Sequence, residues 1–238
     1  MEMKVALITG ASRGLGRTLA LRLARCSYTV IINYCSAEAE AEDVARLAGG
    51  NACALRADVS DRGQVRAMAN EIMTRYGRLD LVINNAGISK DNLLLRQSGK
   101  EWDLIIGTNL TGCFNIIGTM SPLVIQSGGG HIMNIASRSG LRGKAGQPAY
   151  SASKAGLLGL TLTAARELAA GNIRVNGIMP GYLATDMGSQ AGSAQRDAQE
   201  QSLLKTLSSD QEIADFVVFL AGTETITGQI FSLDSRIG

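Results

Sequence analysis

Two side chains near residue 150 have the types and spacing needed for proton transfer. Tyr150 and Lys154 are four residues apart within a pattern that predicts a long helix, so they share one face of it. An ammonium beside a phenol favours the ionised form and lowers its pKa from about 10 toward neutral pH, where a proton donor works best. Because this spacing alone is a weak signal, an ordinary surface pair is the alternative.

A serine precedes this pair at the end of a predicted strand. Ser137 follows the apolar run 132–136, which is typical of a buried strand, and a glycine-rich loop joins it to the helix of Tyr150. At a strand end that faces the start of a helix, the Ser137 hydroxyl is suited to hydrogen-bond a substrate oxygen. A serine without function in a loop is the alternative.

A glycine turn near the start of the chain predicts a nucleotide site. The buried strand 5–8 leads into this turn, and leucines at helical spacing follow it. Such a turn lets a diphosphate approach the backbone at the helix N-terminus. The first and last glycines are one residue further apart than in the usual dinucleotide fingerprint, and a turn without a ligand is the alternative. The turn residues expected at the cofactor are Gly10, Ser12, Arg13, Gly14, Leu15 and Gly16.

The end of the next strand, 28–34, favours NADP(H) over NAD(H). A site that prefers NAD usually has a carboxylate here, which binds the adenine ribose hydroxyls and repels a 2′-phosphate. This chain has no carboxylate before Glu38. Asn33 and Ser36 carry hydrogen-bond donors, and Arg13 in the glycine turn adds a positive charge.

Apolar runs and helical patterns alternate along the rest of the chain. This order predicts an α/β fold: one doubly wound parallel sheet of the Rossmann type, in a single domain spanning 1–238. Ligands of such sheets bind beyond the carboxyl ends of the strands, where the glycine turn, Asp58, residues 84–87 and Ser137 all fall. Further strands are expected at 52–57, 79–83, 173–179 and 229–233, and helices at 37–47, 61–76 (capped by Asp61), 102–125, 150 onward and 212–220.

Composition narrows the possible functions. The net charge is +2 with scattered basic residues and aromatics make up only 4%, which argues against nucleic acid. We expect no membrane-spanning segment and no secretory signal, and the four spaced cysteines indicate reduced thiols in a cytoplasmic protein. The single histidine, His131, has no partners for a metal site and is expected to be structural. The polar stretch 188–202 favours a mobile flap over the pocket, with a plain surface loop as the alternative.

Four motifs occur in order over nearly the whole chain: Thr9-Gly10 with Gly14 and Gly16; Asn84-Asn85-Ala86-Gly87; Ser137 with Tyr150 and Lys154; and Pro180-Gly181. Together they resemble the short-chain dehydrogenase/reductase family. Residues 9–16, Gly146-Gln147 and Thr185-Asp186-Met187 are most similar to its bacterial 3-oxoacyl-[acyl-carrier-protein] reductases.

The resemblance implies residue roles. It makes Tyr150 the acid/base, Lys154 the ligand of the nicotinamide ribose, Ser137 the residue that orients the carbonyl, and Asn109 the residue that positions a water in a proton relay. Other positions implied at the cofactor, besides Tyr150 and Lys154 themselves, are Asp58 and Val59 at the adenine, Asn85, Ala86 and Gly87 in the groove, Pro180 and Gly181, and Thr185 at the carboxamide.

Two departures from the family pattern bear on partners. The arginines that grip an acyl carrier protein are replaced by residues 128–130, all glycine, and by Gly171-Asn172. The C-terminus has Asp234-Ser235-Arg236 in place of Asp-Gly-Gly, which puts a usual subunit contact in doubt. Members are commonly tetramers joined through the helices of Asn109 and Tyr150, so a homotetramer or homodimer is expected.

We therefore expect an NADPH-dependent reductase of a 3-oxoacyl thioester, with the reverse oxidation also possible for this class. One alternative keeps the chemistry but changes the substrate to a sugar, a polyol, or a polyketide or other cyclic ketone. The other is a nucleotide-binding scaffold without catalysis, which the presence of Asn109, Ser137, Tyr150 and Lys154 argues against.

Overall fold

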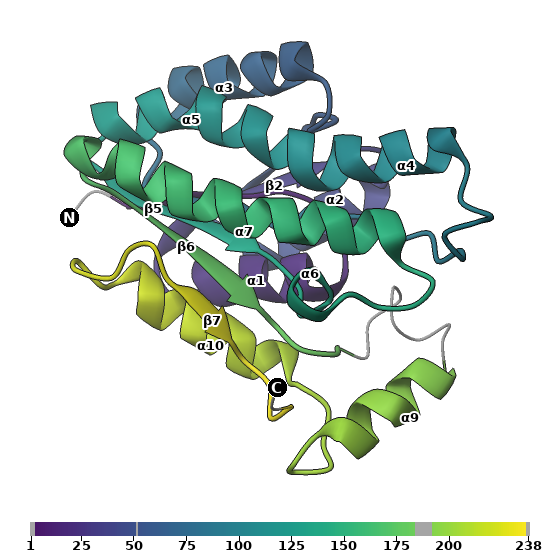
Figure 1. Ribbon diagram of the computed structural model, residues 1–238. Helices are drawn as coiled ribbons and strands as arrows, with labels where there is room; N and C mark the ends of the chain where they lie inside the picture. Colours follow the sequence, from purple (N-terminus) through teal and green to yellow (C-terminus); the bar gives the residue numbers. More distant parts are fainter. Residues whose placement is uncertain (1–2, 51, 184–191, 237–238) are drawn as a thin grey trace.

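The computed structural model describes residues 3–50, 52–183 and 192–236. Within them, seven parallel strands form one sheet in the order β3-β2-β1-β4-β5-β6-β7 (Figure 1). The order reverses direction between β1 and β4, which creates the crevice where ligands of doubly wound sheets bind. The strands are β1 (Lys4–Ile8), β2 (Tyr28–Tyr34), β3 (Cys53–Arg56), β4 (Leu81–Asn84), β5 (Gly130–Ile135), β6 (Ile173–Met179) and β7 (Ile230–Ser232).

Helices cover both faces of the sheet, as the apolar character of the strands requires. Strand β1 shows the alternation: Ala6 and Ile8 pack into one hydrophobic cluster, and Val5 and Leu7 into the other. The predicted α/β sheet is confirmed. One face carries α1 (Gly14–Ala24), α2 (Glu38–Ala48) and α10 (Asp210–Ala221), and the other carries α3 (Arg62–Tyr76), α5 (Gly112–Gln126) and α7 (Pro148–Leu168) (Figure 1).

Local capping explains where two of the helices begin. The Asp61 carboxylate accepts hydrogen bonds from the backbone of Gly63 and Gln64, which confirms the predicted N-cap of α3. The helix expected from about residue 102 starts earlier, as α4 (Gly99–Ile106). Ser98 and Glu101 form a reciprocal capping box there, and their spacing in the sequence is the signal for this earlier start.

A π-helical turn, η1 (Gly107–Thr111), joins α4 to α5. By length and composition the combined stretch Gly99–Gln126 could cross a membrane, and it is the one such helix among the described residues. Half of its most apolar window is buried inside the fold, where α5 packs against α3, α7 and β5. The apolar character of this helix is therefore explained by the protein core.

Four local features differ from or refine the sequence expectations. The loop after Ser137 contains a short helix, α6 (Ser139–Arg142), and α7 ends in a 3₁₀ turn, η2 (Ala169–Gly171). The stretch expected as a flap or plain loop contains α9 (Gly192–Gln201), while 188–191 lie outside the described residues. Gly156 on α7 packs against the neighbouring π-helical turn within the chain, because a Cβ there would lie 2.8 Å from the end of the Leu110 side chain.

Candidate active site

Helix α7 brings the predicted proton-transfer pair together. Pro148 occupies the first turn of this helix, where its missing N–H costs nothing. One turn later, the Lys154 Nζ lies 5.8 Å from the centroid of the Tyr150 ring. Lys154 is only 4% exposed, and its ammonium donates to the carbonyl of Ile135 at 2.6 Å. The buried charge is thus held at the end of β5, beside the half-buried phenol.

Ser137 reaches the same region because its loop is pressed against α7. It follows β5 directly, and its Oγ accepts a hydrogen bond from the backbone N–H of Ser139 at 3.2 Å. A Cβ on Gly140 would lie 2.6 Å from the Lys154 carbonyl carbon and 2.7 Å from the Ala155 nitrogen. Only glycine allows this approach, so the loop that carries Ser137 is fixed on the turn of the helix that carries Lys154.

Asn109 lies fully buried in the π-helical turn and connects three segments. Its Oδ1 accepts from the backbone N–H of Ile88 at 2.8 Å, and its Nδ2 donates to the Ile88 carbonyl and to Ser153 Oγ. Ser153, which we did not predict, in turn donates to the Tyr150 carbonyl at 2.7 Å. Both N–H donors of the Asn109 amide are therefore committed within the chain. A role in holding a water stays a prediction.

Three glycines shape the turn between β1 and α1. Gly10 and Gly14 have φ of +61° and +54°, the left-handed region that glycine adopts without strain. At Gly16 a Cβ would lie 2.5 Å from Asn85 Nδ2 and 2.6 Å from the Gly10 carbonyl oxygen. The turn is thus packed closely against the segment after β4 at the start of an eleven-residue helix, and phosphate binding there stays a prediction. Ser12 and Leu15 are both buried in this turn.

Thr9 fastens the glycine turn to the segment after β4. Its Oγ1 accepts hydrogen bonds from the backbone N–H groups of Asn85 and Ala86, each at 3.0 Å. The Asn85 amide returns two bonds, to the carbonyls of Thr9 and Gly10. Next in the chain, Gly87 lies against the pair in α7, because a Cβ there would be 3.8 Å from Lys154 Nζ. Thr9 was not predicted as a site residue. The signal in the sequence is a hydroxyl-bearing residue between a buried strand and the first glycine of the turn.

The structure corrects the role expected of Asn33. This residue is only 1% exposed, and its side chain is used within the chain. Its Nδ2 donates to the carbonyls of Leu55 and Ala57, and its Oδ1 accepts from the Gly10 backbone at 3.4 Å. The Asn33 side chain therefore accepts a hydrogen bond from the glycine turn and donates to the residues around the end of β3. It has no donor left for a 2′-phosphate. Ser36 is exposed at the end of β2 and remains a candidate.

The remaining expected cofactor residues in the described part of the chain follow the carboxyl ends of β3 and β6. Asp58 is half-buried after β3, and its Oδ1 accepts from the backbone and hydroxyl of Ser60. Val59 is buried against α5. Gly181 follows Pro180 at the end of β6 with φ of +77°. Thr185 lies outside the described residues.

The C-terminal turn is held within the chain at the same edge of the sheet. The Asp234 side chain is only 5% exposed, accepts from Arg236 Nε at 2.7 Å, and lies 4.0 Å from the guanidinium of Arg138. Ser235 meets Ser202, which follows α9, through a hydroxyl contact of 2.5 Å. The Asp-Ser-Arg sequence thus joins the residue after Ser137 to the segment after α9.

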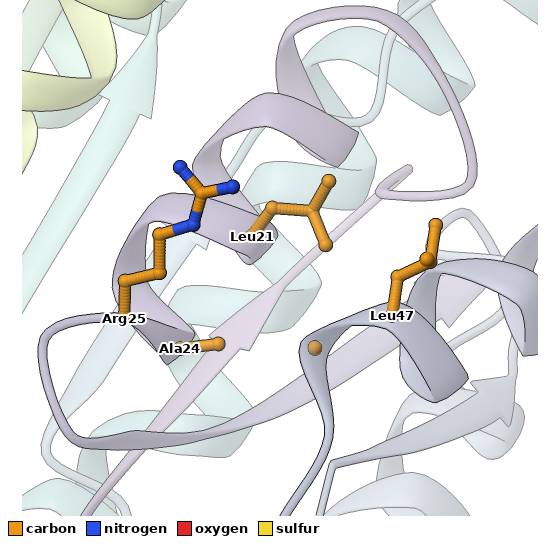
Figure 2. Close-up of a pocket in the computed structure, with 5 residues that line it drawn as sticks. Leu21, Ala24, Arg25 and Leu47 are labelled. Atoms are coloured by element: carbon orange, nitrogen blue, oxygen red, sulfur yellow. The ribbon is translucent and has the colours of Figure 1, made fainter.

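One hollow in the surface lies away from these residues. It measures about 370 Å³ between the carboxyl ends of α1 and α2, and Leu21, Ala24, Arg25 and Leu47 line it (Figure 2). Because helices of a doubly wound fold run antiparallel to the strands, this hollow is at the opposite end of the sheet from the glycine turn. We assign it no part in catalysis.

The single histidine is buried near the start of a central strand. His131 is the second residue of β5 and is 2% exposed. Burial lowers its pKa to about 4, so it is neutral at physiological pH. In the described part of the chain, no three His, Cys, Asp or Glu side chains are grouped so as to hold a metal ion.

Comparison with known proteins agrees with this geometry. Residues 4–196 match the short chain dehydrogenase family. The 3-oxoacyl-[acyl-carrier-protein] reductase FabG of Staphylococcus epidermidis is 43% identical over 232 residues, which cover 95% of both chains. That of Staphylococcus aureus is also 43% identical, over 95% of this chain and 94% of its own. The Thermotoga maritima FabG is 38% identical over 100% of this chain and 98% of its own. With the glycine turn, the buried lysine and the tyrosine in place, the chain belongs to the short-chain dehydrogenase family, and it is an oxidoreductase that uses a nicotinamide nucleotide.

Proposed function

We propose that this enzyme reduces a 3-oxoacyl thioester to the 3-hydroxyacyl product with NADPH. One observation carries the proposal: Tyr150 and the buried Lys154 lie on the turn of α7 that contacts the Ser137 loop, and Lys154 Nζ is close to Gly87 beside the glycine turn. A proton donor and a nucleotide cradle therefore share one edge of the sheet. The substrate class is supported by the names of the staphylococcal and Thermotoga relatives.

The chain supplies proton transfer and orientation. When bound, the nicotinamide supplies the hydride. The Tyr150 hydroxyl donates its proton to the carbonyl oxygen as negative charge develops there. The Lys154 ammonium favours the negative charge left on the phenolate. Since the Ser139 N–H donates to Ser137 Oγ, the Ser137 hydroxyl hydrogen remains to donate to the substrate oxygen. Asn109 keeps the segment after β4 in register with α7.

The residues of the glycine turn fit a dinucleotide diphosphate. A Cβ at Gly10 or Gly16 would clash with neighbouring backbone atoms, and Gly14 begins α1. Asp58 and Val59 would line the adenine end, and Gly87, Tyr150 and Lys154 the nicotinamide end. The exposed Arg13 precedes α1 and adds a positive charge for NADPH.

The substrate proposal has a direct test. Purified enzyme is expected to oxidise NADPH with acetoacetyl thioesters, at a kcat/KM at least about tenfold above that for small ketones, sugars and polyols. The thioester and the attached pantetheine arm give binding energy that small ketones lack. The measurement is the loss of absorbance of the reduced nicotinamide across the panel. Turnover of cyclic ketones or sugars without any thioester activity would replace the proposal by the alternative substrate class.

Two positions in the sequence support the alternative substrate class. Gly128 and Gly171 stand where arginines for an acidic carrier protein are expected, so neither can form an ion pair with a carrier. Other cations lie close to Ser137 in the chain, namely the exposed Arg142 and Lys144 of the α6 loop and the adjoining Arg138. A comparison of carrier-bound and coenzyme A-bound acetoacetyl substrates separates carrier recognition from thioester recognition.

We also propose a homotetramer with subunit contacts along α5 and α7. Large apolar side chains are exposed on these helices: Phe114 at 53%, Ile125 at 47% and Leu162 at 37%. Gly159 on α7 has open space beside it. Light scattering after gel filtration is expected to give four times the 25.0 kDa chain mass, and Phe114→Glu to give a smaller species. A monomeric parent protein would contradict the proposal.

A cytoplasmic location is proposed on the cysteines. All four, Cys26, Cys35, Cys53 and Cys113, are free thiols, as expected in a reducing compartment. Cell fractionation followed by immunodetection tests the location. Recovery in a membrane or secreted fraction would refute it.

A further inference from the structure

The burial of Asn33 leaves few donors for a 2′-phosphate at the end of β2. What remains on this side is Ser36, exposed in the turn after the strand, and Arg13 in the glycine turn. The backbone places these two segments together, because Ala11 N–H donates to the Asn33 carbonyl at 3.0 Å. A second cation would stabilise a phosphate dianion here, since acidic side chains lie near the same turn.

Two carboxylates face this turn. Glu38 accepts a hydrogen bond from the Tyr34 hydroxyl at 3.1 Å. Asp58 lies close enough to Cys35 that its charge adds to burial, the larger cause, in raising the pKa of the Cys35 thiol. With Arg13 as the single cation, a phosphate would meet two negative charges and only one positive charge.

Arg56 supplies the missing charge from the neighbouring strand. It is the last residue of β3, and its Cα is paired with that of Tyr34 in the parallel register of β2 and β3. Its exposed side chain crosses to the turn after β2, where Nε donates to the Cys35 carbonyl at 3.2 Å. The Arg56 charge also opposes the rise in the pKa of Cys35, which places the guanidinium beside this residue.

The anchored guanidinium still has donors to offer. Arginine has five N–H groups in a planar fork, which suits two oxygens of one phosphate. Within the described part of the chain, Arg56 Nε makes a hydrogen bond, and its two terminal amino groups make no further hydrogen bond or ion pair. They belong to the last residue of β3, which lies two positions before Asp58 and whose Nε contacts the turn that contains Ser36.

We propose that Arg56 is the second cation of the cofactor site and determines its preference for a 2′-phosphorylated adenine ribose, together with Arg13 and Ser36. The inference rests on the proposed use of NADPH. It depends on a basic residue two positions before Asp58, at the end of the strand that pairs with β2.

The experiment compares Arg56→Gln with the parent protein, using Arg13→Gln as a second site variant. The control is Arg66→Gln, an exposed arginine on α3. Calorimetry measures the binding of 2′,5′-ADP and of 5′-AMP, and steady-state kinetics measure kcat/KM for NADPH and NADH. Arg56→Gln is expected to weaken 2′,5′-ADP by about ten- to a hundredfold, the effect of losing charged hydrogen bonds, and to lower the NADPH-to-NADH ratio of kcat/KM similarly.

The outcomes separate this inference from the cofactor proposal. A parent protein that binds 2′,5′-ADP no better than 5′-AMP would overturn the use of NADPH itself, and the inference with it. A parent that prefers 2′,5′-ADP, with Arg56→Gln keeping the whole preference, would overturn the role of Arg56 and leave NADPH in place. Equal losses for both nucleotides would show that Arg56 only supports the fold. Arg56→Lys, which keeps the charge but not the fork, is expected to lie between parent and Arg56→Gln.

Discussion

Replacing Tyr150 with phenylalanine is expected to lower kcat by about 10²- to 10⁴-fold, the contribution of a positioned general acid. The change removes only the hydroxyl, so the ring still fills its half-buried place at the start of α7. Lys154 keeps its bond to the Ile135 carbonyl. NADPH binding, measured by calorimetry or by nicotinamide fluorescence, is therefore expected to remain within a few fold of the parent.

Tyr28→Phe is the matched control for this variant. Tyr28 is the first residue of β2, at the amino end of the strand and therefore at the opposite edge of the sheet. Loss of the Tyr28 hydroxyl is expected to leave kcat near the parent value. Should Tyr150→Phe retain more than about a tenth of the parent kcat, Tyr150 is not the acid. If it loses NADPH binding as well, the effect is one of folding or cofactor affinity.

Gly16→Ala is expected to damage both stability and cofactor binding. The new Cβ would lie 2.6 Å from the Gly10 carbonyl oxygen and 2.8 Å from the Ala11 Cα, which are backbone atoms that cannot turn aside. Overpacking of this kind costs about 1–3 kcal/mol. For a chain of this size the melting temperature would fall by about 2–4 °C per kcal/mol. Because relief must come from moving the glycine turn, NADPH affinity is expected to fall at least about tenfold.

Gly99→Ala is the control that shows whether the losses of stability and NADPH affinity come from the position of Gly16 or from an added methyl group in general. Gly99 begins α4, its φ is not positive, and a Cβ there has open space around it. This change is expected to alter stability by about 0.5 kcal/mol or less, without effect on NADPH binding. Differential scanning fluorimetry and calorimetry on both variants give the comparison. Similar melting temperatures for the two would refute the tight contact at Gly16.

Much of the site was determined by local sequence. The spacing of Tyr150 and Lys154 within one helix was sufficient to put them on one face, since residues i and i+4 are neighbours on a helix surface. The apolar runs before Gly10, Asn85 and Ser137 predicted buried parallel strands, and the carboxyl ends of parallel strands meet at one edge of a sheet. The N-cap at Asp61 was likewise a local signal, and the structure bears it out.

Contacts between distant segments were decided only by the tertiary structure. The sequence allowed Asn33 to face the cofactor, but the order β3-β2-β1 surrounds it with the carbonyls of Leu55 and Ala57 and buries it. The same order brings Arg56 to the turn after β2, a pairing that no spacing within one element reveals. Asn109, in the π-helical turn, finds its partners at Ile88 and Ser153, far away in the chain. Local patterns determine which residues an element carries and which way they face; the burial of a side chain and its partners depend on the strands and helices packed beside it.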